Sequence, residues 1–192
     1  MKMLEIVEEY SELSIKRDRL REKISGSNKA IKTAVTDARI SYTNEDINMK
    51  NLYQGIIREH ENMKCDATRA LNDVESIIRS LFRQFMRQVD NTNAQTLSVV
   101  SDKIFEKKEK VSNNIKELNI QREHAVLKAK DLLIAKEISG DEITHELTDT
   151  YIEQIKTLEA KLRYYQFFID NIQFNLKKKT DYTEETRSGL VH

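Results

Sequence analysis

The sequence has no proline, no tryptophan, four glycines and one cysteine in 192 residues. Because proline and glycine are the residues that most destabilise helix interiors, their scarcity favours long helices. The single cysteine, Cys65, excludes a disulfide within the chain. No apolar stretch approaches the roughly 20 residues of a membrane span, and the amino terminus has no signal-peptide pattern. We therefore expect an intracellular, cytoplasmic protein that does not contact membranes.

Charge of one sign is not in excess either. Thirty-two Lys and Arg residues balance 32 Asp and Glu residues, so the formal net charge is +0. A neutral chain has no overall electrostatic attraction to nucleic acid, and any such partner would have to meet a local patch. With 33% charged and 39% hydrophobic residues, the chain is too polar for a large globular core. Its apolar residues are nevertheless too regularly spaced for disorder.

The regular spacing is that of a coiled coil. From Met3 to Ile24, apolar positions alternate in steps of three and four, and from Tyr42 to Ile77 they recur every seven residues. The steps lengthen between Leu81 and Leu97, where a supercoil would run nearly straight. The pattern predicts one long helix over residues 1–138. Gly26 marks a possible break near residue 26, although the heptad phase is unbroken across it.

A second glycine predicts a reversal of the chain. Gly140 lies in ISGDE, after which a new apolar pattern starts. We expect a turn at 139–142, an antiparallel return helix over 143–179 and a tail or linker at 180–192. The predicted packing of the return helix uses Ile155, Leu158, Leu162, Tyr165 and Ile169 against Val111, Ile115, Leu118, Ala125 and Leu132. In the neighbouring RYYQFF stretch, Tyr164, Phe167 and Phe168 lie off the seam and are candidates for contact with a partner.

Helix length then suggests the oligomeric state. Residues 29–138 would form a rod about 165 Å long, of which the return helix covers only about 55 Å. An exposed seam would forgo about 1.5–3 kcal/mol for each large side chain, so a second copy is the economical cover. The predicted fold class is therefore all-α, an elongated coiled coil that forms an antiparallel homodimer. The predicted dimer interface comprises Ile56, Met63, Ala70, Val74, Ile77, Leu81, Phe82, Phe85, Val89, Leu97, Val100 and Ile104.

The segment DVESIIRSLFRQFMRQVDNTNAQTLSVVSDKIFEKKEKVSNNIKELNIQREHAVLKAKDLL, residues 73–133, has an Ile-x-x-x-Phe centre, lengthened spacing, K-x-x-x-I-x-x-L and an Ala-rich end. With the turn and return helix after it, it resembles the coiled coil that follows the B-box in tripartite-motif (TRIM) proteins. The resemblance covers most of the chain as a pattern, and no single motif in it is diagnostic. It implies an antiparallel dimer that holds two modules at opposite ends of a rod. The metal-binding RING and B-box modules themselves are not in this sequence.

No motif in the sequence predicts an enzyme. THELTD, at 144–149, begins like the zinc-protease pattern HExxH, but Asp149 stands where the second histidine is required. There is no phosphate-binding glycine loop and no nucleophile elbow. We therefore expect no catalytic residues, no metal, no cofactor and no small-molecule substrate.

Three arginines form the most distinctive charged pattern. Arg79, Arg83 and Arg87 are spaced four apart, with no acidic residue between Glu75 and Asp90. Such a row is either a solvated helix face or a contact for an anion such as RNA phosphate or a partner carboxylate. The sequence as a whole favours a dimerisation scaffold that spaces attached modules and binds a protein partner near its centre. The alternative is a helical nucleic-acid-binding or recombination-accessory protein.

Overall fold

The computed structural model describes residues 2–43, 47–134 and 140–188. These residues form four helices and no strand: α1 (Met3–Thr43), α2 (Ile47–Asn91), α3 (Ala94–Ile134) and α4 (Gly140–Ser188). The prediction of an all-α fold is confirmed. The chain divides into two compact units. The first unit comprises Met1–Ser11 with Gln84–His192, and the second comprises Glu12–Arg83.

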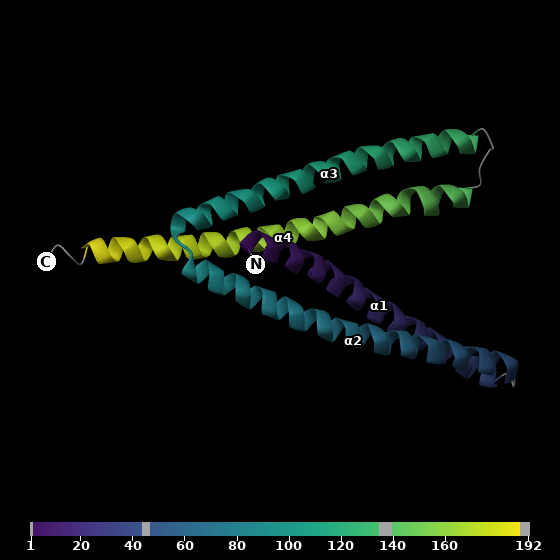
Figure 1. The fold of residues 1–192 in the computed structure, drawn as a ribbon. Helices are drawn as coiled ribbons and strands as arrows, with labels where there is room; N and C mark the ends of the chain where they lie inside the picture. Colours follow the sequence, from purple (N-terminus) through teal and green to yellow (C-terminus); the bar gives the residue numbers. More distant parts are fainter. Residues whose placement is uncertain (1, 44–46, 135–139, 189–192) are drawn as a thin grey trace. The chain divides into compact units, whose positions relative to one another are not determined.

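In the second unit, α1 and α2 run side by side (Figure 1). An ion pair of 2.7 Å between Arg21 Nη2 and Glu75 Oε1 joins the two helices. Many of the buried side chains in this unit are small, and the larger ones are aliphatic. They are Ser14, Ser27, Ala34, Ala67, Val74, Ile78 and Leu81. Small residues let two helices approach closely, but they also limit how much apolar surface the pair can bury.

This pairing contradicts the prediction of one helix over residues 1–138. α1 ends at Thr43 and α2 begins at Ile47, and residues 44–46 lie outside the described part. The physical reason is that heptad spacing marks an apolar face but does not say what covers it. Here α2 runs back along α1, and each helix covers the apolar face of the other within the same chain. α1 itself is continuous through Gly26.

A second interruption falls at Thr92 and Asn93, between α2 and α3. The side-chain Oδ1 of Asn93 accepts a hydrogen bond of 2.8 Å from the backbone N–H of Thr96, which is the arrangement of a helix N-cap. At the end of α2, Lys179 Nζ donates to the carbonyl oxygens of Asp90 and Thr92, each at 2.8 Å. The polar backbone groups that the break exposes are thus satisfied: Lys179 binds carbonyl groups where α2 ends, and Asn93 caps the start of α3. Asn93 lies within the stretch from Leu81 to Leu97, in which the apolar steps lengthen.

In the first unit, α3 and α4 lie side by side and antiparallel (Figure 1). Lys108 Nζ donates a hydrogen bond of 2.5 Å to Gln166 Oε1 across the pair. Of the residues predicted to pack here, Ile155, Tyr165 and Ile169 are buried. Those that are partly buried are Val111, Ile115, Leu118, Ala125, Leu158 and Leu162. The side chain of Leu132 lies outside the described residues.

The bounds of the return helix differ from the prediction. α4 begins at Gly140, so residues 140–142 are helical and only residue 139 of the predicted turn lies outside the described part. α4 also continues to Ser188, which makes the prediction of a tail from residue 180 wrong up to that point. The stretch has no proline or glycine before Gly189, so nothing in it stops the helix.

Candidate functional site

Half of the predicted dimer interface is buried by the chain itself. Phe85, Val89, Leu97 and Ile104 have no exposed surface, and all lie in the first unit. Val74 and Leu81 are 4% exposed in the second unit. For these six residues the chain itself supplies the cover that was expected from a second copy. Of the remaining residues, Ile77 is 45% exposed, and Ile56, Met63, Ala70, Phe82 and Val100 are partly buried.

The aromatic stretch of α4 also has an internal partner. The ring of Tyr10, from the first turns of α1, lies 6.1 Å from Tyr164, 6.1 Å from Phe167 and 4.9 Å from Phe168, measured between ring centroids. Phe168 in turn meets Phe85 edge to face at 4.6 Å. Such aromatic pairs add about 0.5–1.5 kcal/mol beyond the area they bury. Of the three aromatics that the sequence offered to an outside partner, Phe168 is therefore fully buried, whereas Phe167 remains 38% exposed.

A carboxylate beside this aromatic cluster joins three helices. Glu8 accepts hydrogen bonds from Lys107 Nζ at 2.6 Å and from Tyr165 OH at 2.7 Å, and it forms an ion pair with Lys161 Nζ at 2.9 Å. We call these four residues the Glu8 cluster. Ile6 and Val7, next to Glu8 in α1, are fully buried. The heptad pattern does not predict the cluster, because nothing in it links residue 8 to residues 107 and 161.

The electrostatics of the cluster keep Glu8 ionised at neutral pH. Partial burial on its own raises the pKa of Glu8, but hydrogen bonds from Lys107, Tyr165 and Lys161, together with the charge of Lys161, outweigh it. They lower the pKa of Glu8 from 4.5 to about 2. A carboxylate with such a pKa stays ionised and is a poor general acid or base near neutral pH. The Glu8 cluster therefore holds residues 3–11 onto α3 and α4.

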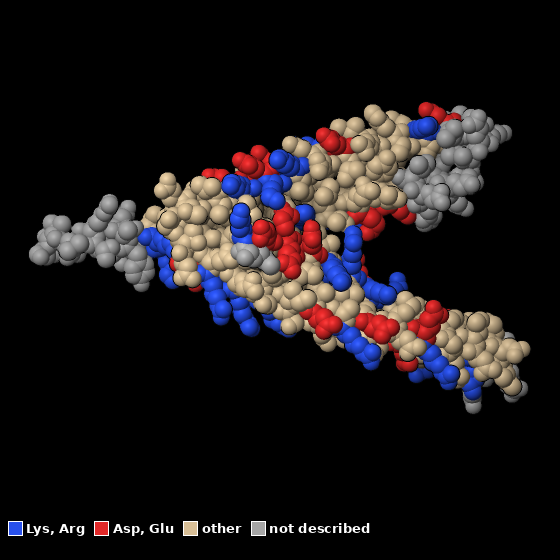
Figure 2. Space-filling model, viewed as in Figure 1, with Lys and Arg blue, Asp and Glu red and all other residues tan. Residues whose placement is uncertain are grey.

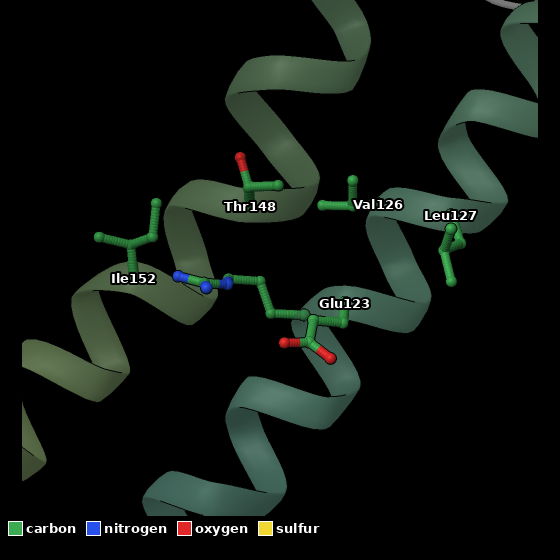
Figure 3. A pocket seen from close by; sticks show the side chains of 6 residues that line it. Glu123, Val126, Leu127, Thr148 and Ile152 are labelled. Atoms are coloured by element: carbon green, nitrogen blue, oxygen red, sulfur yellow. The ribbon is translucent and has the colours of Figure 1, made fainter.

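Farther along the same hairpin, the two helices leave an apolar groove of about 620 Å³. Its lining comes from Arg122, Glu123, Val126 and Leu127 of α3 and from Thr148 and Ile152 of α4. Figure 3 shows Val126 pointing from α3 toward α4, while Leu127 points to the outer side of α3. Leu127 is 58% exposed, and Ile120, two turns earlier, is 54% exposed.

The predicted arginine row lies on α2. Arg79, Arg83 and Arg87 are all exposed, and Figure 2 shows basic side chains gathered along the carboxy-terminal half of this helix. Arg79 is 4.0 Å from Glu75, whose other oxygen already bonds to Arg21 at 2.7 Å. Within the described part of the chain, Arg83 and Arg87 have no ion pair. The row is thus available to a ligand.

Other kinds of site find no support in the described residues. In these ranges no three His, Cys, Asp or Glu side chains stand close enough to hold a metal ion. No helix in the described part of the chain is long and apolar enough to pass through a membrane. The chain matches no protein-family model, and it has no significant similarity to a curated protein or to a solved structure.

Proposed function

We propose that the chain is a helical scaffold that self-associates and holds attached or bound modules at a fixed spacing. One observation carries the proposal: the apolar groove between α3 and α4, beside which Ile120 and Leu127 stay exposed. Exposed apolar side chains next to an apolar groove are typical of protein-interaction surfaces. The role agrees with what the resemblance to the tripartite-motif coiled coil implies, although the interface that we propose differs from the predicted one.

The occupant that we propose for this surface is a second copy of the same hairpin. Two antiparallel helices bury only the seam between them, and two such hairpins can complete a four-helix bundle by pairing their open apolar sides. Each large side chain covered in this way contributes about 1.5–3 kcal/mol. A closed pair of identical hairpins also fixes the distance between whatever each copy carries, which is the function of a scaffold.

The mass in solution tests the proposal. Light scattering at low micromolar concentration should give twice the chain mass of 22.5 kDa. The double variant Ile120→Lys with Leu127→Lys should weaken the dimer at least tenfold, because it places two charges in the apolar contact. Ile47→Lys is the matched control: Ile47 is 71% exposed in the second unit, so this change should leave the dimer intact.

Two outcomes would contradict the proposal. A mass of 22.5 kDa up to high micromolar concentration would exclude self-association. A dimer that Ile47→Lys disrupts and the α3 double variant leaves intact would place the interface in the second unit. Circular dichroism of each variant, with an unchanged helix content, ensures that the comparison reports association and not unfolding.

A further inference from the structure

One face of α2 combines exposed basic residues with small polar ones. It consists of Ser76, Arg79, Ser80, Arg83, Gln84 and Arg87, and we call it the arginine face. All six belong to one continuous helix, so their spacing follows from helix geometry alone. Consecutive arginines four residues apart rise about 6 Å along the helix axis. All six side chains are exposed.

The arginine face keeps a net positive charge that the rest of the chain does not cancel locally. Residues 76–89 contain three arginines and no acid. The flanking acids are the exposed Asp73, one turn before Ser76, Glu75, which bonds to Arg21 at 2.7 Å, and Asp90. Arg79 reaches Glu75 only at 4.0 Å with 63% of its side chain exposed, a geometry that contributes little to stability. The positive charge therefore remains in solvent without a strong internal partner.

The opposite side of the helix shows why this face is not a membrane or protein anchor. Ile78, Leu81 and Phe85 are buried within the chain, at 6%, 4% and 0% exposure. A membrane-surface helix needs its apolar side free to enter the lipid, and that side is already covered. A protein hot spot usually has a large apolar or aromatic anchor, and here the exposed apolar residue beside the six is Ile77, 45% exposed at the edge of the face, two helical turns before Gln84. The six residues themselves offer only polar and charged groups.

What the face does offer is hydrogen-bond donors. Guanidinium groups bind phosphate oxygens in a bidentate manner, and Ser and Gln side chains are common contacts to phosphate and sugar. We propose that the arginine face binds the phosphate backbone of a nucleic acid without reading its sequence. This activity is independent of the proposed self-association, since its residues lie on α2 and the groove lies between α3 and α4.

Binding to a labelled oligonucleotide tests the proposal. Fluorescence anisotropy with a 30-nucleotide oligo(U) should show saturable binding at 50 mM salt. Three phosphate contacts predict a slope of about −2 in log K against log salt for a single strand, and about −2.7 for a duplex of equal length. The variant Arg79→Gln, Arg83→Gln, Arg87→Gln should bind at least tenfold more weakly, with a slope near zero.

The matched control removes the same charge elsewhere. Lys103, Lys110 and Lys116 of α3 are exposed, and their replacement by Gln should leave both affinity and salt slope unchanged. Glutamine is a good helix former, so both triple variants should keep their helix content. Equal losses in the two variants, or wild-type binding without a salt slope, would overturn the proposal. So would tighter binding to polyglutamate or to anionic vesicles than to the oligonucleotide.

Discussion

The two compact units bury very different side chains. In the first unit, residues of all four helices supply large buried groups, among them Ile6, Phe85, Leu97, Tyr165 and Phe168. In the second unit, α1 and α2 alone supply the buried residues, several of which are Ser or Ala. A long apolar seam therefore does not by itself make a strong core. The number of elements that meet, and the size of their side chains, decide how much surface is removed from water.

The same difference applies to the polar contacts. The Glu8 cluster joins segments of α1, α3 and α4 through one carboxylate, whereas in the second unit the ion pair described between the helices is that of Arg21 and Glu75. We therefore expect the second unit to open more readily than the first. In native-state hydrogen exchange, its amides should exchange through openings of lower free energy.

Phe168→Ala should have the largest effect and should break the first unit. Phe168 is fully buried and contacts both Tyr10 and Phe85. Loss of a buried phenylalanine leaves a cavity and costs about 3–5 kcal/mol in the free energy of unfolding. Urea denaturation measures the loss, and hydrogen exchange shows where it falls. The amides of residues 94–134 should exchange much faster than in the wild type.

Phe174→Ala is the control for this change, because Phe174 lies on the same helix and is 70% exposed. Its free energy of unfolding should change by no more than about 0.5 kcal/mol. Similar losses in the two variants would mean that the aromatic cluster at Tyr10 does not form the core of the first unit.

Glu8→Gln should have an intermediate effect that depends on pH. The full pKa shift, from 4.5 to about 2, corresponds to about 3 kcal/mol, and a side chain that is 26% exposed warrants a smaller value of about 1–2 kcal/mol. Because the pKa is lower in the folded state, the stabilisation is complete above about pH 4.5. It is lost as the pH falls toward 2.

The difference in unfolding free energy between wild type and Glu8→Gln should therefore be greatest near pH 7 and should shrink progressively below pH 4.5. Denaturation curves at pH 7, 4 and 3 measure it. A difference that stays constant over this range would show that the carboxylate charge does not stabilise the first unit. Tyr165→Phe keeps the charge of Glu8 and removes one donor, so its smaller loss should depend less on pH.

Sequence periodicity was informative about local structure and uninformative about partners. The heptad pattern predicted helices through most of the chain, and the all-α class is confirmed. The pattern could not show that α2 folds back along α1. An apolar seam has the same spacing whether the helix that packs on it belongs to the same chain or to another. Asn93, the N-cap of α3, was a usable sequence signal for the start of a new helix, but the apolar pattern on both sides of it suggested a continuous one.

The functional residues divide in the same way. The arginine row could be predicted, because it depends only on spacing within one helix and on the absence of neighbouring acids. The Glu8 cluster and the α3–α4 groove could not, because both require knowledge of which residues far apart in sequence come together. Glu8 and Tyr165 are separated by 157 positions. No local pattern carries that information.

The smallest predicted effect is a gain in stability of the second unit alone, from replacing a glycine by alanine. Gly26 and Gly55 lie inside α1 and α2, and a methyl group added at either position would meet no atom within 4 Å. Replacing a glycine in a helix interior by alanine stabilises the helix by about 0.5–1 kcal/mol, because the unfolded chain loses conformational freedom. Gly26→Ala and Gly55→Ala should each slow amide exchange in residues 12–83 about two- to fivefold and leave residues 94–134 unchanged. Faster exchange in either variant would show that this glycine serves a close approach or a bend that the helix requires. Equal slowing in both units would show that they open together. The difference in buried side-chain size between the two units would then no longer explain how the chain unfolds.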